Sequence, residues 1–82
     1  DPNNVQGVWL TALSVKGKRL DLEGNCKTLE EMYQFIDKLD KNLGTVTFRG
    51  AELKTFEEEK LNIRVDYYNF QLGVELKNGA VN

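Results

Sequence analysis

Hydrophobic and polar positions alternate with a period of two in most of the chain and with helical spacing in its middle. Residues 8–15 are rich in β-branched and aromatic side chains, and residues 18–24 alternate between leucines and polar or charged residues. Lys16-Gly17 between them supplies the positive-φ position that a two-residue hairpin turn favours. The chain is therefore predicted to begin with a β-hairpin.

A capped amphipathic helix is predicted next. Thr28 and Glu31 have the spacing of a capping box, in which each side chain satisfies the backbone N–H of the other residue. Apolar residues then recur every three or four positions as far as Leu43 and form a single stripe. Gly44 is expected to end the helix in the left-handed conformation. The stripe predicts a helix of about four turns that covers one face of a sheet.

The second half of the chain returns to a period of two. Residues 45–54 alternate but change phase at Gly50, which indicates a β-bulge. Residues 56–60 are expected to be a charged connection. The apolar residues are odd-numbered over 61–65 and even-numbered over 68–76, so this part is either one bulged strand or two segments. We favour a variable strand or arm in the first of these stretches and a long central strand in the second.

These elements predict an α+β fold in which a ββαββ chain forms one four-stranded sheet covered by one helix. A right-handed crossover through the helix leaves a gap for the last strand and gives the order 1-2-4-3, with strands 1 and 3 at the edges. We expect strands 2 and 4 to run parallel in the middle. The arrangement is a ferredoxin-like sheet, circularly permuted, with its N-terminal helix missing. Because one helix cannot cover four strands, the remaining apolar surface requires an upstream helix, a second subunit or a partner.

The whole chain, 1–82, is expected to be a single domain. Residues 1–7 are predicted to be a turn-rich lead-in and residues 78–82 a frayed polar tail. The expected core between sheet and helix consists of Leu20, Leu22, Leu29, Met32, Phe35, Ile36, Leu39, Val46, Phe48, Phe70, Leu72 and Val74.

Composition narrows the chemistry. The chain has no His and a single Cys, so an internal disulfide, the usual zinc ligand sets and the Ser-His and Cys-His nucleophile arrangements are excluded. Cys26 is expected to be a small half-buried hydrophobic residue. A net charge of −2, with cations scattered among acids, gives no nucleic-acid footprint. No apolar run approaches the roughly 18–20 residues that span a bilayer. We therefore expect an interaction module without cofactor or metal, not an enzyme.

Four segments of the chain resemble a known family. They are Gly7-Val8-Trp9-Leu10-Thr11-Ala12-Leu13, Leu20-Asp21-Leu22-Glu23-Gly24, Phe35-Ile36-Asp37-Lys38-Leu39 and Phe70-Gln71-Leu72-Gly73-Val74-Glu75-Leu76. They resemble the extracytoplasmic domain of PilN, the inner-membrane platform protein of type IV pilus machines, which is similar to proteins of type II secretion. Residues 56–65 form a longer connection than is typical of that family.

The resemblance implies a scaffold role in pilus biogenesis. In the family, a cytoplasmic tail, a transmembrane helix and a coiled coil precede this domain, which would place it on the periplasmic side of the inner membrane. It would pair with PilO, a related ferredoxin-like protein, while the cytoplasmic tail binds PilM. The chain does not begin with Met, so we expect membrane contact only through a helix upstream of these residues.

Exposed sheet edges accept a partner strand, and self-pairing as a homodimer is left open. Trp9 is equally compatible with the core and with an interface. The residues expected to take part in interactions are Val8, Trp9, Leu10, Thr11, Leu13, Thr45, Thr47, Arg49 and Tyr67.

Three alternatives are left open. A BON-type extracytoplasmic binding module could be aligned with residues 15–53. A small-molecule-sensing ferredoxin-like regulatory domain would use Gly24-Asn25 as a ligand loop. An acylphosphatase-like enzyme needs an Arg in a phosphate-binding loop, whereas Arg49 and Arg64 are in strand-like settings.

Calorimetric titration separates these hypotheses. Because the chain offers no metal-ligand or phosphate-binding motif, Zn²⁺, Ca²⁺ and nucleotides are each expected to give no specific heat. Micromolar binding of any of them would favour the ligand-sensing domain over the scaffold.

Overall fold

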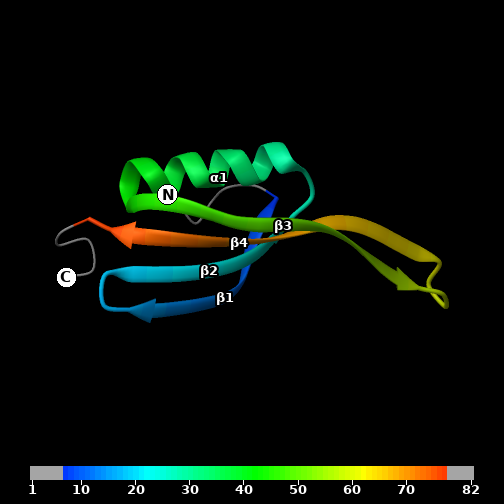
Figure 1. Ribbon diagram of the computed structural model, residues 1–82. Coiled ribbons are helices and arrows are strands. Elements are labelled where there is room, and N and C mark those ends of the chain that lie inside the picture. Colours follow the sequence, from blue (N-terminus) through cyan, green and yellow to red (C-terminus); the bar gives the residue numbers. More distant parts are fainter. Residues whose placement is uncertain (1–6, 78–82) are drawn as a thin grey trace.

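The protein is seen here as a computed structural model that describes residues 7–77 (Figure 1). Its elements follow the order ββαββ, as expected. They are β1 (Val8–Lys16), β2 (Arg19–Cys26), α1 (Leu29–Asn42), β3 (Gly44–Glu58) and β4 (Ile63–Leu76). The expected lead-in, apart from Gly7, and the expected tail over 78–82 lie outside the described residues. The α+β class, with one open four-stranded sheet and one helix within residues 7–77, is confirmed.

The strand order β1-β2-β4-β3 is confirmed, but the predicted direction of β4 is wrong. β4 is antiparallel to both of its neighbours, as its pairing with β2 from Arg19↔Glu75 to Cys26↔Tyr68 shows. Consequently β2 and β3 run in the same direction and β4 runs between them in the opposite one. The reason is the short turn between β3 and β4, because a hairpin can join only antiparallel neighbours, whereas parallel neighbours need a long crossover.

The interpretation of residues 56–60 as a connection is also wrong. β3 continues to Glu58, and the turn is confined to Glu59–Asn62. β2 pairs with β4 only as far as Tyr68. Residues 54–67 therefore leave the sheet as a two-stranded ribbon, which we call the arm (Figure 1, right). The arm accounts for the elongated shape of the molecule, whose extents are 49 × 21 × 20 Å.

The bulge predicted at Gly50 is confirmed by a register shift between Phe48 and Gly50. The phase change before Tyr68 has another origin. β4 is one continuous strand, and its register with β3 has no further shift from Gly50 to Glu58. Apolar residues of the arm instead lie on the opposite side of the ribbon from those of the core, since successive side chains point to opposite faces.

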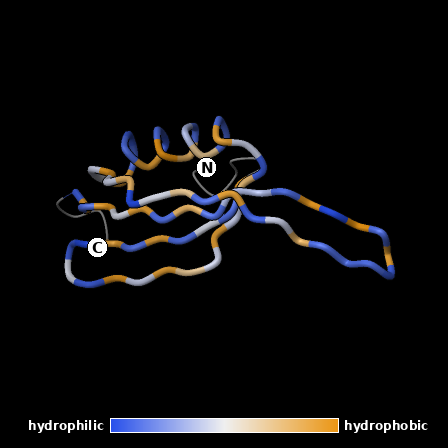
Figure 2. The backbone as a smooth tube through the Cα atoms, turned by 45° about the vertical axis from the view of Figure 1, so that its right-hand side comes forward, coloured by the Kyte–Doolittle hydropathy of each residue, from blue (hydrophilic) through white to orange (hydrophobic). Residues whose placement is uncertain are grey.

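The core lies between α1 and the two central strands. Figure 2 shows the alternation of hydrophobic and hydrophilic residues along the strands. The buried hydrophobic residues are Leu20, Leu22, Cys26, Met32, Phe35, Leu39, Phe70, Leu72, Val74 and Leu76. Of the other residues expected there, Leu29, Ile36 and Val46 are partly buried against this core. The expectation for Phe48 is wrong: 52% of it is exposed, because β3 is an edge strand beyond the cover of α1. Cys26 is fully buried instead of half-buried.

Both ends of α1 are defined by specific contacts. The predicted capping box is confirmed: the hydroxyl of Thr28 accepts from the N–H of Glu31 at 3.2 Å, and the Glu31 carboxylate accepts from the N–H of Thr28 at 3.0 Å. The predicted left-handed C-terminus is wrong, because Leu43 caps the helix in a right-handed conformation and Gly44 begins β3. Glycine is needed at that position because a Cβ would collide with the backbone of Glu75.

Replacing Phe35 by Ala tests the assignment of the helix face. Phe35 is buried, with its ring centroid 6.0 Å from that of Phe70, so Phe35→Ala is expected to lower the free energy of unfolding by about 3–5 kcal/mol. Urea denaturation followed by circular dichroism measures this loss. Tyr33→Ala is the matched control: 60% of Tyr33 is exposed, so its effect should stay within about 1 kcal/mol. Equal midpoints for Phe35→Ala and the parent would show that the helix face is misassigned.

Candidate interaction surface

An apolar groove lies beside α1, on the side where β1 forms the edge of the sheet. It has a volume of about 230 Å³. Its lining residues come from β1, β2, α1 and the residue after α1: Leu10, Leu13, Leu20, Leu22, Phe35, Leu39 and Leu43. α1 covers the central strands but does not reach far enough to cover β1. The groove is therefore a part of the core that the described residues leave open.

The outer wall of the groove depends on an irregularity in β1. The register with β2 shifts between Leu10 and Ala12, so Thr11 has no partner across the strand pair. This bulge keeps Leu10 and Leu13 on the same face despite their odd spacing. Both are exposed, Leu13 by 59%. The unpaired Thr11 thus positions two leucines where a partner can cover them.

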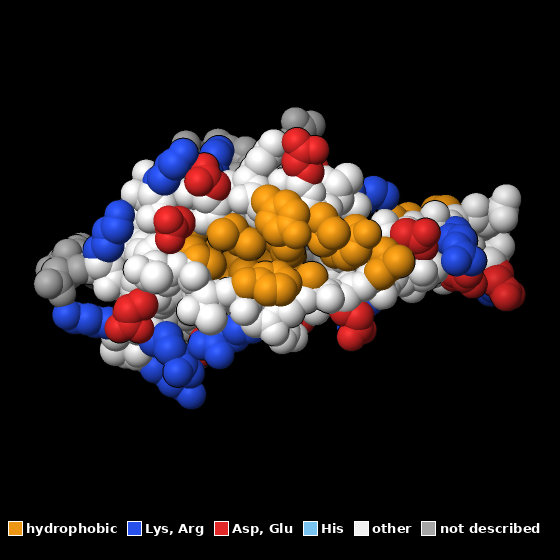
Figure 3. All heavy atoms as spheres, turned by 45° about the horizontal axis from the view of Figure 1, so that its top comes forward, with side chains coloured by type: hydrophobic (Ala, Val, Ile, Leu, Met, Phe, Trp, Pro, Cys, Tyr) orange, Lys and Arg blue, Asp and Glu red, His pale blue; other side chains and the backbone are white. Residues whose placement is uncertain are grey.

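A second apolar area lies between α1 and β3. Figure 3, in which the top of Figure 1 comes forward, shows one continuous hydrophobic patch near the middle of the molecule and charged side chains toward both ends. α1 and β3 are the elements at the top of Figure 1. Their exposed large hydrophobic residues in this part of the fold are Tyr33, Phe48 and Leu53. Apolar surface therefore flanks the helix on both sides.

The face of the sheet away from α1, called the open face here, is polar. Asp21 accepts ion pairs from Arg19 at 3.3 Å and from Arg49 at 3.7 Å. The guanidinium of Arg49 lies over Gly73, where a Cβ would come within 2.7 Å of Nη2. All three charged side chains are partly exposed, so the pairs add little stability. The open face is largely suited to water: apart from Trp9, which is exposed there, the exposed large hydrophobic residues lie on the helix side and on the arm.

The structure distributes the predicted interaction residues over both faces. On the helix side, Val8 packs against the core while Leu10 and Leu13 line the groove. Trp9 pairs with Asn25 on the open face and is exposed, so it does not belong to the core. Thr11 occupies the bulge.

The remaining predicted residues lie away from the groove. Thr45, Thr47 and Arg49 are exposed on the open face of β3, and Tyr67 is half-buried at the base of the arm. The nine residues therefore do not form a single surface. The expected interaction residues did not include Tyr33, Phe48 and Leu53, because the spacing of these residues also fits positions in or beside a core.

Cys26 carries a thiol, but its surroundings do not favour a reactive thiolate. It is free and fully buried. Burial raises the pKa of its thiol above the ordinary value, and the negative charge of Glu31 raises it further, while a hydrogen bond with the backbone of Met32 opposes both effects. A thiol that is buried and protonated is a structural residue of the core.

Two further features are absent from the described residues, a metal-binding cluster and a membrane-spanning helix. Within 7–77 no group of three His, Cys, Asp or Glu side chains could hold a metal ion. No described helix has the length and apolar character needed to cross a membrane.

Comparison with known proteins identifies the family. The fold is a small α+β domain whose unpaired apolar surfaces are typical of proteins that work in assemblies. A family model described as fimbrial assembly protein (PilN) matches residues 4–76. Because this match spans most of the chain, the chain belongs to the PilN family, and its role lies in type IV pilus assembly. No curated protein and no solved structure matches the chain.

Alkaline titration tests the environment of Cys26. The unfolded chain releases the thiol proton near the ordinary pKa of 9.0, whereas the native protein retains it. The unfolded state then binds fewer protons than the native state, so the free energy of unfolding must fall as pH rises above 9.0. Cys26→Ala lacks this contribution, and its deficit relative to the parent should shrink between neutral and alkaline pH.

Thiol labelling provides the second readout for Cys26. The native protein should react slowly with a disulfide reagent and rapidly once it is denatured. Fast labelling of the native protein, or parallel pH profiles for parent and Cys26→Ala, would contradict the buried environment.

Proposed function

We propose that this domain is a non-enzymatic scaffold of the type IV pilus inner-membrane platform and that it pairs with a PilO-like partner on the periplasmic side. The observation that carries the proposal is the apolar groove beside α1, whose outer wall is formed by an edge strand. Membership of the PilN family supports a place in the pilus assembly machinery. A segment upstream of this chain would anchor the domain in the membrane, and its cytoplasmic part would bind a PilM-like protein.

The groove combines two kinds of attraction. Covering Leu10 and Leu13 removes apolar surface from water, which is the main driving force of most protein association. The adjacent edge offers backbone groups as well. Lys16 and Arg19 close a two-residue hairpin and form a hydrogen-bonded pair, so Leu13 and Val15 belong to non-hydrogen-bonded pairs and direct their N–H groups away from β2. A partner strand could pair with these groups while its side chains fill the groove.

Local contacts weigh against the ligand-sensing alternative. The proposed loop at Gly24-Asn25 lies inside β2. Asn69 donates a hydrogen bond to the Asn25 side chain at 3.0 Å, and the space beside Gly24 is filled by the ring of Phe70. This position therefore has no room and few free polar groups for a small molecule.

The phosphatase alternative is likewise unsupported by the positions of the arginines. Arg49 faces Asp21, and Arg64 donates to Glu57 at 2.9 Å. Both arginines lie on strands, and their guanidinium groups already face carboxylates. A phosphate-binding loop instead needs cationic and backbone donors that converge on an empty site.

A double substitution in the groove tests the proposal. Leu10→Lys with Leu13→Lys places two charges on the outer wall but leaves the buried core intact, because both side chains are exposed. Binding to the PilO-like domain of the same machine, measured by calorimetry, is expected to weaken at least tenfold, or by about 1.4 kcal/mol. Circular dichroism should show an unchanged fold.

The matched control carries the same charge change on the arm. Leu61→Lys with Ile63→Lys alters two exposed apolar residues remote from the groove and should leave binding to the PilO-like domain within about twofold of the parent. Parent-like binding by the groove variant, or an equal loss in the arm control, would contradict the groove as the contact. Absence of binding to any PilO-like domain would contradict the scaffold function itself.

A further inference from the structure

Beyond its base, the arm extends away from the rest of the described chain (Figure 1). β2 ends its pairing with β4 at Tyr68, so residues 54–67 pair only with each other. An isolated two-stranded hairpin is marginally stable in water. An arm of this length therefore benefits from stabilisation along its faces.

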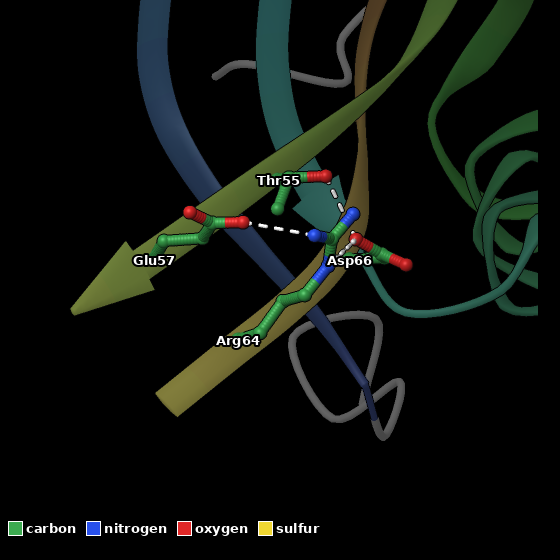
Figure 4. A network of polar contacts seen from close by, with 4 residues as sticks. All are labelled: Thr55, Glu57, Arg64 and Asp66. Atoms are coloured by element: carbon green, nitrogen blue, oxygen red, sulfur yellow. Dashed lines mark hydrogen bonds and ion pairs between the residues drawn. The ribbon is translucent and has the colours of Figure 1, made fainter. Parts of the chain in front are cut away.

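One face of the arm is stabilised within the chain by polar contacts (Figure 4). The hydroxyl of Thr55 donates to Asp66 at 2.7 Å across the strand pair. Arg64 donates to Glu57 at 2.9 Å, and its Nε lies 3.8 Å from Asp66. These four side chains connect the two strands and face water.

The other face is apolar in its centre and charged at its ends. From base to tip its cross-strand pairs are Lys54↔Tyr67, Phe56↔Val65 and Glu58↔Ile63. Phe56 is 55% exposed and Ile63 is also exposed. This face thus presents a positive charge, an aromatic residue and a negative charge in that order along β3.

We propose that the arms of two copies of this chain pack with these apolar faces together, antiparallel, around a two-fold axis near Phe56 and Val65. A two-fold contact uses the same patch on both copies, so the patch must complement itself. In the antiparallel arrangement Lys54 of each copy lies against Glu58 of the other, and the apolar centres coincide. A parallel arrangement would bring both Lys54 side chains to one end of the contact and both Glu58 side chains to the other, where the like charges repel each other.

Both charged side chains are available for this contact. Among the described residues Lys54 has no ion pair, and Glu58 accepts a hydrogen bond only from the backbone N–H of Lys60. The ends of the patch can therefore take an intermolecular partner without breaking an ion pair within the chain.

The size of the patch makes the contact weak. A stable interface buries about 800 Å² per partner, which is more than the few side chains of one arm face can supply. The dimer should therefore dissociate on dilution over a range of about 10–1,000 μM. This self-association goes beyond the pairing proposed above and uses a different surface, since the arm extends away from the groove formed by β1, β2 and α1.

Charge reversal tests the orientation of the two arms. Lys54→Glu alone leaves two acids at each end of the contact, and Glu58→Lys alone leaves two bases, so each variant is expected to dimerise at least about tenfold more weakly than the parent. An equimolar mixture of the two variants restores opposite charges at both ends. Sedimentation velocity should therefore show heterodimers in the mixture at concentrations where each variant alone is monomeric.

Glu59→Lys is the matched control for Glu58→Lys, because it makes the same change in charge one residue further along the chain, in the turn. It should dimerise like the parent. Circular dichroism of every variant checks folding, and recovery in the mixture shows that each single variant is folded. A parent that stays monomeric up to about 1 mM, dimerisation by either single variant as strong as the parent's, or a mixture that forms no heterodimers would overturn the proposal. If the parent dimerises through the arm but does not bind a PilO-like domain through the groove, only the function proposed above is rejected.

Discussion

The packing of the apolar stripe of α1 on the two central strands determines what the rest of this molecule buries and what it leaves open. Met32, Phe35 and Leu39 meet the even-numbered side chains of β2 and β4, and the rings of Phe35 and Phe70 lie in contact at the centre. The capping box at Thr28 and the close approach of Gly44 to β4 fix the two ends of the helix over this pair of strands. Burial of this kind, roughly proportional to apolar area, is the dominant favourable contribution to folding.

A helix that covers two strands of four leaves both edge strands partly uncovered. On β1 the result is an apolar groove, and on β3 it is an exposed patch that includes Phe48. The open face has a different character because Asp21 and the two arginines around it are suited to water. Exposed apolar surface is therefore concentrated where an assembly protein needs it, beside the helix and along the arm. Membership of the PilN family is consistent with this distribution.

Local patterns were sufficient to predict the elements whose signals lie within a few residues. The first β-hairpin, the Thr28 capping box, the bulge at Gly50 and the strand order all follow from residue type, period and crossover hand, although the hairpin turn is made by Gly17-Lys18 and not by the predicted Lys16-Gly17. The direction of β4 was predicted wrongly because it depends on how short the β3–β4 turn is. The charged residues 56–60 also fit a loop, so the sequence did not show how short the turn is.

The arm and the groove could be predicted only in part. Alternation shows which side chains share a face but does not tell whether another element covers that face. Phe48 has the period of a core residue and is nevertheless exposed, because its position at the edge is a property of the assembled sheet. Among the expected interaction residues, Leu10 and Leu13 were brought together by the bulge at Thr11, which a single sequence did not reveal.

Amide hydrogen exchange at the edge of β1 tests the central claim most directly, since it reads the backbone groups that a partner strand would use. In the isolated domain the N–H groups of Leu13 and Val15 point away from β2 and should exchange rapidly. On addition of the PilO-like domain, NMR should show these two amides protected together with resonance shifts around the groove. Rapid exchange of both amides in a saturated complex would contradict the account, because the partner would then be bound at another surface.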